Sequence, residues 1–500
     1  MNFLAEKIEA RAPAFILLIG VYFVVNLLTR LSLPNALEID EAAQILMSQW
    51  YALGYDSQPP LYNWVQHLVI DGIGQSLFAL SLVKNLFLFL SYVLYYLAAR
   101  QLLASRSLAA AAALGLLTIP EIGWLAQRDL THSNASLLAA CLFLYGLSRT
   151  LQRPSMASYL VTGIAIGIGL MSKYNFSILC FCACLAVVID PLYRQRIFDR
   201  RILITATVAL VIILPHGLWL AQNFDIAFQD TAAKLAADAQ RGTVSQIGAG
   251  LAELVVTIAS YCALTLVVYA AVLDGPLRSL PRAGNSKTRL IEIMFAILVV
   301  LLLCMVLFAG TAQLKVRWVS PVLFILPLYL CLKIEAAGID GRHFLKRLLP
   351  VILVLMVLIP ASLVVRIVAA GPMGTHPKLT VPYQGFVEEI VRKPEIDPAL
   401  VIAGDALMAG NLRMQMPGIA VDTQSYPLHS PAFSWSAQNP ILMVWRANEE
   451  TGAIPPGLLS RLEQRIGSVP PLEPEVIALP YLYGDDGDGF RFGYAWVRKP

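Results

Sequence analysis

Charged residues are scarce in this chain of 500 residues: Asp, Glu, Lys and Arg make up 14% of it, against roughly 25% in soluble globular proteins. Hydrophobic residues reach 57%, so the charges are too few to cover the apolar surface in water. The net charge of +4 is far from the basic excess of a nucleic-acid-binding protein. The composition also excludes a disordered chain and a collagen-like repeat. It therefore predicts a membrane protein with many spans.

Cysteine is also rare, and all seven cysteines fall inside apolar runs, which excludes a disulfide-stapled scaffold. Cys180, Cys182 and Cys184 stand at alternate positions, and on a helix such side chains point in different directions. Packing is therefore a better interpretation than a metal cluster. No spacing typical of metal ligands, such as His-Glu-x-x-His, occurs. The sequence predicts no disulfide and no certain cofactor or metal, and leaves a divalent metal open.

Apolar runs near the ~20 residues needed to cross a bilayer recur along the first three-quarters of the chain. About eleven are present, over residues 13–31, 76–102, 108–126, 134–150, 157–172, 174–190, 202–222, 250–273, 290–310, 316–333 and 349–370. The first run follows Lys7 and Arg11, as in a signal peptide, but no small-x-small cleavage site follows it, which favours an uncleaved anchor. We predict an α-helical polytopic membrane protein with about 11 spans.

The basic residues predict the orientation, because cytoplasmic loops accumulate Lys and Arg. With the N-terminus inside, alternate connections hold basic pairs, among them Lys7 and Arg11, Arg100 and Arg106, Arg149 and Arg153, and Arg194 and Arg196. The segment 32–75 between the first two runs contains no Lys or Arg. An odd number of spans then places the residues beyond about 371 outside the cytoplasm.

Two domains follow from this pattern: a transmembrane domain over 1–370 and a soluble α/β domain over 371–500. In the second, apolar stretches at 399–403, 441–445 and 494–497 predict strands, and 404–417 predicts a helix. The outer loop 32–75 of the first has helical spacing over 42–55, and Trp50, Tyr51 and Trp64 suit the headgroup level of a membrane. We expect this loop to carry interfacial helices.

Ionisable residues at the edge of the apolar region gather on the predicted outer side, and such residues are functional hypotheses by default. The cations are Lys84, Arg128, Lys173, Lys315 and Arg317, and the acids are Asp40, Glu41 and Asp129. Each alone has a simpler explanation, such as a helix cap, a polar loop or a snorkelling lysine. Together, cations suit a phosphate and a carboxylate suits a general base. The set predicts a reaction of a lipid phosphate outside the cytoplasm.

Five short segments resemble the polyprenyl-phosphate-sugar glycosyltransferases of the GT-C class, which include protein O-mannosyltransferases, lipid A aminoarabinose transferases and lipopolysaccharide galacturonosyltransferases of the Rgt type. They are Asp40–Ala42, Gly54–Leu61, Asp129–Ser133, Gly169–Tyr174 and Arg317–Pro321, in the family's order. Gln58 stands where the aminoarabinose transferases have a phosphate-binding lysine, which argues against aminoarabinose. The Arg317-Trp318-x-x-Pro321 segment looks closest to the Rgt type, which suggests galacturonic acid or a related sugar.

The resemblance implies an inverting transfer of one sugar from a polyprenyl phosphate to lipopolysaccharide, lipid A or another envelope acceptor, at the periplasmic side of a bacterial inner membrane. It implies Asp40 as the base, with Glu41 and Asp129 orienting the acceptor or holding Asp40 in place. Lys173 and Arg317, helped by Lys84 and Arg128, would bind the donor phosphate. The residues that would contact sugar or acceptor are Gln58, Tyr62, His132 and Tyr174.

Two alternatives remain at this point. A transporter or lipid flippase would carry its ionisable residues near the midplane, on broken helices in paired repeats, and no convincing repeat is visible. A lipopolysaccharide polymerase or ligase would have a long outer loop late in the chain, where the loop 223–249 is modest. Membrane lipids are expected neighbours in every case, and nucleic acid is not.

Overall fold

The computed structural model describes residues 2–225, 243–274, 280–308, 311, 313–447, 452–485 and 487–499. Most of the loop 223–249 and the last two residues of the predicted run 290–310 lie outside these ranges. The chain forms two compact units. The first consists of Met1–Val25, Ser57–Tyr62 and Lys84–Ile359, and the second of Asn26–Asp56, Asn63–Val83 and Pro360–Pro500.

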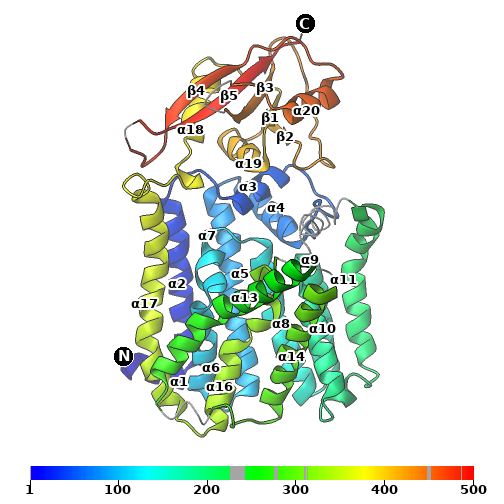
Figure 1. Cartoon of the computed structure of the whole chain (residues 1–500), viewed down its shortest axis with the longest axis vertical. Coiled ribbons are helices and arrows are strands. Elements are labelled where there is room, and N and C mark those ends of the chain that lie inside the picture. The colour runs from blue at the N-terminus through cyan, green and yellow to red at the C-terminus, as the bar shows by residue number, and fades with distance from the viewer. Residues whose placement is uncertain are drawn as a thin grey trace. The chain divides into compact units, whose positions relative to one another are not determined.

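The first unit is helical (Figure 1). Its α-helices, some of which continue into the second unit, are α1 (Asn2–Ala10), α2 (Ala12–Ser32), α5 (Leu77–Leu102), α6 (Arg106–Leu114), α7 (Ala126–Arg128), α8 (His132–Gln152), α9 (Met156–Ser172), α10 (Phe176–Ile189), α11 (Ile202–Gln222), α13 (Thr243–Val272), α14 (Ser286–Phe308), α15 (Ser320–Leu323), α16 (Leu326–Ala336) and α17 (Gly341–Val368). Within the unit α9 packs against α8 and α11, α10 against α14, and α6 against α16.

Each of the eleven predicted runs contains helix, but fewer are long and apolar enough to span a membrane. Among the described residues six helices qualify, namely α2, α5, α11, α13, α14 and α17, and a bent pair over Arg106–Thr118 and Glu121–Arg128 raises the number to seven. Helices α9 and α10 are apolar but shorter, and the run 316–333 is divided between α15 and α16. The polytopic helical fold is confirmed, and the count of eleven spans stays a prediction.

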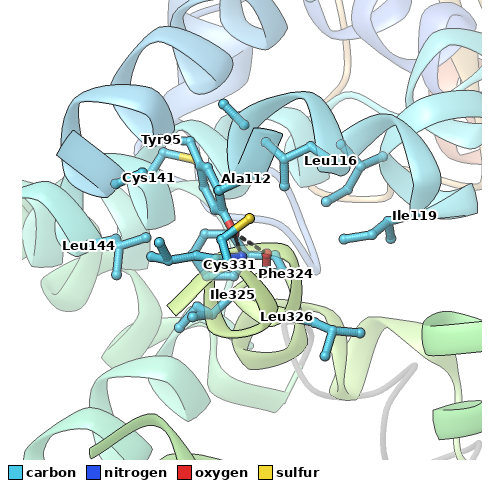
Figure 2. Close-up of a cluster of buried hydrophobic side chains, with 14 of the residues drawn as sticks. Tyr95, Ala112, Leu116, Ile119, Cys141, Leu144, Phe324, Ile325, Leu326 and Cys331 are labelled. Atoms are coloured by element: carbon cyan, nitrogen blue, oxygen red, sulfur yellow. Dashed lines mark hydrogen bonds between the residues drawn. The ribbon is translucent and has the colours of Figure 1, made fainter. Parts of the chain in front are cut away.

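A buried cluster between α5, α6, α8 and the α15–α16 break forms part of the core of the first unit (Figure 2). The hydroxyl of Tyr95 donates a hydrogen bond to the carbonyl oxygen of Phe324 at 3.0 Å and accepts one from the backbone N–H of Leu328 at 3.2 Å. The break would otherwise leave backbone groups unpaired in an apolar interior. Tyr95 therefore fixes the position of Phe324.

The bent pair has an abrupt turn of 75° between Thr118 and Glu121. Pro120 lies at the turn, where it cannot supply a backbone N–H to continue the first helix. A Cβ atom at Gly123 would lie 2.5 Å from the carbonyl oxygen of Leu117, so this close return of the chain requires glycine. The turn places Glu121 at the start of a single π-helical turn, Glu121–Leu125.

The second unit contains α3 (Ile39–Met47), α4 (Leu61–Ile73, from Asn63 on), α18 (Tyr383–Val387), α19 (Ala406–Gln415), α20 (Pro456–Ile466) and a five-stranded sheet of order β2-β1-β3-β5-β4. The strands are β1 (Leu400–Ala403), β2 (Ala420–Thr423), β3 (Ile441–Arg446), β4 (Glu475–Pro480) and β5 (Gly489–Val497). β1 pairs in parallel with β2 and β3, and β5 pairs antiparallel with β3 and β4. The predicted α/β character, three of its strands and the helix within 404–417 are confirmed.

The helix expected over 42–55 is wrong in its extent, because α3 ends at Met47. Beyond it the hydroxyl of Tyr55 donates to the carbonyl oxygen of Trp50 at 2.9 Å and accepts from the N–H of Ala52 at 3.2 Å. These side-chain bonds close a turn in place of another helical turn. α4 then begins after Pro59 and Pro60, as the fixed φ of proline favours.

Helix α3 packs against α19, so the first loop and the C-terminal part share one compact unit. Asn411 Oδ1 accepts a hydrogen bond from the N–H of Leu37 at 2.7 Å, and Arg413 Nε donates to the carbonyl oxygen of Ile45 at 3.2 Å. Burial lowers the pKa of Arg413 to about 10, which leaves it cationic at neutral pH. The boundary at 370 and 371 between independent domains, and contact of this loop with lipid headgroups, stay predictions.

Candidate active site

A polar cleft in the first unit collects residues from four stretches of the chain. It contains about 340 Å³ of empty space and is open to solvent. Its polar lining consists of Glu121, Ser133, Ser136, Lys173, Asn175, Arg317 and Ser320. Two residues predicted from sequence to bind phosphate, Lys173 and Arg317, thus line one cleft although they are far apart in the chain.

Both cations lie in connections between helices beside this cleft, Lys173 directly after α9 and Arg317 shortly before α15. Lys173 is the C-cap of α9 with extended backbone, and its Nζ donates to Ser133 Oγ in the first turn of α8 at 2.7 Å. Arg317 lies in a 3₁₀ turn, Val316–Trp318, whose carbonyl at Arg317 accepts a hydrogen bond from the side chain of Asn175. Cations and hydroxyls arranged in this way suit a phosphate or carboxylate ligand.

A second, apolar groove lies further along α8 and shares the lining residue Phe324 with this cleft. The cleft is lined by Ser133, Ser136, Leu137 and Ala140, and the groove by Phe143, Leu144, Leu147, Ser148 and Leu151. These positions recur every three or four residues and so follow one face of the helix. Phe324 lines both spaces, and α14 supplies much of the opposite wall of the groove. From 133 to 151 the helix rises about 27 Å at ~1.5 Å per residue, close to the ~30 Å of a bilayer core.

The two other predicted phosphate ligands make different contacts. Lys84 is buried, and its Nζ donates to the carbonyl oxygen of Gln127 at 2.9 Å. The guanidinium of Arg128, the next residue, lies 5.2 Å from the ring centroid of Trp124. Lys84, in α5, therefore contacts the bent segment to which Arg128 belongs, and neither is among the residues that line the cleft. Their part in phosphate binding stays a prediction.

Of the residues expected to contact sugar or acceptor, three lie in two aromatic pairs of the first unit. The ring of Tyr62 lies 5.8 Å from that of His132, and both residues are buried. The hydroxyl of Tyr174 lies 3.1 Å from Nε2 of His216. Gln58, three residues before the start of α4, is half-buried. Their roles in binding stay predictions.

The three predicted carboxylates are divided between the two units. Asp129, half-buried, ends α7 in the first unit. Asp40 and Glu41 lie in the first turn of α3 in the second unit, where the helix dipole favours acidic side chains. Asp40 is half-buried, whereas Glu41 is buried and pairs with Arg30 at 2.8 Å. The roles of these carboxylates stay predictions.

Two polar residues at these places were not predicted. Glu121 lines the cleft beside Lys173, and its one sequence signal was a carboxylate directly after Pro120 in an otherwise apolar run. Arg30 holds Glu41, and its signal was a charge inside the end of the first apolar run. In the described part of the chain, His, Cys, Asp and Glu form no group of three that could hold a metal ion.

Comparisons with known proteins show the family of this chain. A model of the dolichyl-phosphate-mannose-protein mannosyltransferase family matches residues 57–219. The lipopolysaccharide core galacturonosyltransferase RgtB of Rhizobium johnstonii is 45% identical over 484 residues, 97% of each chain. RgtA of the same organism is 42% identical over 485 residues, 96% of this chain and 97% of its own. The chain belongs to the family of these transferases. It is a glycosyltransferase of the GT-C class and a multi-pass membrane protein of the bacterial envelope, as the Rgt-type segments predicted.

A solved structure has the same fold over nearly the whole chain. ArnT from Cupriavidus metallidurans bound to undecaprenyl phosphate has a TM-score of 0.57 and 14% identity, and the match covers 97% of this chain and 98% of that one. The apo state of that protein gives a TM-score of 0.58. The expected combination of membrane helices with a C-terminal α/β domain is therefore an ArnT-like fold.

Proposed function

We propose that this transferase moves one galacturonic acid unit from a polyprenyl phosphate to the core of lipopolysaccharide. The observation that carries the proposal is the polar cleft with Lys173 and Arg317, together with an apolar groove further along α8 that shares Phe324 with it. A polyprenyl-phosphate sugar fits such a pair of spaces, because it carries an anionic phosphodiester head on a long apolar chain. The names of RgtA and RgtB support galacturonate as the sugar and the lipopolysaccharide core as the acceptor.

The reaction needs little chemistry from the protein beyond charge and placement. A hydroxyl oxygen of the acceptor attacks the anomeric carbon, the bond from that carbon to the phosphate oxygen breaks with inversion, and the lipid phosphate leaves with the electron pair. Lys173 and Arg317 stabilise the charge that grows on the phosphate. Asp40 takes the proton of the attacking hydroxyl, and Asp129 orients the acceptor.

The predicted orientation belongs to the proposal. The N-terminus lies in the cytoplasm, the protein lies in the inner membrane, and the loop 32–75 and the C-terminal part 371–500 lie in the periplasm. The absence of Lys and Arg between Ser32 and Gln75 supports this placement. Alkaline phosphatase fused after Gln75 or Pro500 is expected to be active, and fused after Arg153 inactive. The opposite pattern would reverse the orientation.

The transfer itself is tested with the purified full chain in lipid nanodiscs. Polyprenyl-phosphate galacturonic acid and lipopolysaccharide with a truncated core are supplied, and mass spectrometry follows the acceptor. We expect a gain of one hexuronate unit, and no gain from a nucleotide-linked galacturonate. Transfer of a neutral hexose alone would overturn the choice of sugar. Movement of the lipid donor across vesicles without a change in acceptor mass would indicate a flippase.

A further inference from the structure

Arg30, in the last turn of α2, is surrounded by the chain segment that follows it. Its Nε donates to Oε1 of Glu41 at 3.1 Å, and its Nη2 donates to Oε2 of the same carboxylate at 2.8 Å. Nη1 donates to the carbonyl oxygen of Pro34 at 3.0 Å, and Nη2 also donates to that of Ala36 at 2.8 Å. The side chains of Arg30 and Glu41 are 7% and 3% exposed. One buried guanidinium therefore ties together the whole turn between α2 and α3.

The carboxylate of Glu41 accepts hydrogen bonds both from Arg30 and from the backbone of its own helix. Besides the bidentate contact with Arg30, its Oε2 accepts a hydrogen bond from the backbone N–H of Glu38 at 3.3 Å. Glu41 thus caps the helix on which it lies, in the manner of the third residue of a capping box. Glu38, the N-cap, pairs in turn with Arg366 of α17. Both carboxylates that flank Asp40 are anchored to an arginine of a different helix.

Asp40 lies between these two anchors on the first turn of α3. Successive residues of a helix point about 100° apart, since a turn takes ~3.6 residues. The contacts of Glu41 with Arg30 therefore direct Asp40 to another side of the helix, and they fix the rotation of α3 about its own axis. A base must lie within about 0.5 Å of its productive position.

We propose that Arg30 and Glu41 form a clamp that positions Asp40 for proton transfer, with Glu41 a positioning residue and not a second base. This inference rests on the proposed function, in which Asp40 is the base. Four hydrogen bonds occupy the Glu41 carboxylate. Three of them come from Arg30, a cation that would have to give up its partner if Glu41 bound substrate. Buried arginine without a counter-charge is strongly unfavourable, so the pair acts as one unit.

A double-mutant cycle with Arg30→Lys and Glu41→Gln tests the clamp. Arg30→Lys keeps the charge but loses the bidentate fork. We expect each single variant to lower kcat by about tenfold or more, with KM for donor and acceptor nearly unchanged, and the double variant to be no worse than the worse single variant. The acidic limb of the kcat–pH profile stays in place, because Asp40 is still the base and a base acts only in its deprotonated form. Glu388→Gln, in the exposed pair of Glu388 with Arg392 at 3.3 Å, is the matched control and should leave kcat unchanged.

Two results would overturn the clamp. Losses that multiply in the double variant would mean that Glu41 acts independently of Arg30, and a rise in acceptor KM at constant kcat for Glu41→Gln would mean that it binds substrate. Thermal unfolding of each variant separates loss of fold from loss of placement, and the charge-swapped pair Arg30→Glu with Glu41→Arg gives a second cycle if a single variant fails to fold. Asp40→Asn is measured alongside: full activity there would remove the base from the proposed function, whereas an additive cycle with an inactive Asp40→Asn would remove the clamp alone.

Discussion

Gly410 of α19 lies directly against the backbone of Ala42 in α3: a Cβ atom at position 410 would be 2.1 Å from the Ala42 carbonyl oxygen. The backbones of the two helices are in contact. Beside this contact, Asn411 Oδ1 accepts a hydrogen bond from the backbone N–H of Leu37. Helix α3 is therefore held on one side by Arg30 and on another by the C-terminal sheet domain. Within the second unit, the domain beyond residue 371 takes part in placing the Asp40 helix.

Gly410→Ala is expected to push α3 away from α19. A methyl group at 2.1 Å from backbone atoms that cannot rotate aside forces a shift of the helix, and overpacking of this kind costs about 1–3 kcal/mol. We expect a lower unfolding temperature in detergent and a loss of transfer activity larger than the loss of folded protein. Gly385→Ala, whose added carbon would meet its nearest neighbour at 3.7 Å, is the control. Equal activity of the two variants would contradict the importance of this contact.

Asp40→Asn is expected to abolish transfer while the protein still inserts and folds. The amide keeps the size of the side chain but cannot accept the proton of the acceptor hydroxyl, and loss of a general base costs about 100-fold or more. Hexuronate transfer to lipopolysaccharide, followed by mass spectrometry, is the measurement. Glu473→Gln changes an exposed carboxylate of the same unit and should leave the rate unchanged. Full activity of Asp40→Asn would exclude Asp40 from the mechanism.

The membrane class, the α/β domain and much of the cleft could be predicted because they depend on composition and short motifs. Lys173 and Arg317 both line one cleft, and the cue was two cations at the same predicted membrane boundary. The sequence also contains the pattern of the groove along α8, namely apolar residues from 137 to 151 at helical spacing. The pattern alone did not predict a groove for an apolar ligand, because the same spacing is found wherever helices pack against one another.

Other features could not be predicted, because partners distant in sequence decide them. The sequence predicts Glu41 only as an acid at the start of a helix, because its pairing with Arg30 depends on how the chain folds between them. Helix α3 stops at Met47 although its spacing continues to Tyr55, since the Tyr55 hydroxyl bonds the backbone of a turn. Glu121 enters the cleft through a sharp bend that depends on the close return of the chain at Gly123.

Arg317→Ala and Lys173→Ala are expected to weaken use of the lipid donor more than use of the acceptor. Each removes a charged hydrogen-bond donor for the phosphate, worth about 1.5–3 kcal/mol, so KM for the donor should rise at least about tenfold. Ser133→Ala should cost less, because it removes only the neutral partner of Lys173. Arg153→Ala, at an exposed arginine on the predicted cytoplasmic side, is the control. An equal loss for donor and acceptor would indicate a structural arginine.

Asp422→Ala is expected to destabilise the C-terminal sheet domain without touching the chemistry. Asp422 is 1% exposed at β2, its Oδ1 lies 2.8 Å from Nη2 of Arg461, and its Oδ2 lies 3.2 Å from Nε of Arg465. Removing it leaves two guanidinium groups of α20 without their buried counter-charge, which costs about 3–5 kcal/mol. The unfolding temperature should fall by several degrees, whereas activity measured well below it should stay close to that of the parent. Glu388→Ala breaks an exposed pair instead, and such pairs are worth about 0–1 kcal/mol. Similar unfolding temperatures for the two variants would show that Asp422 is not the anchor of α20.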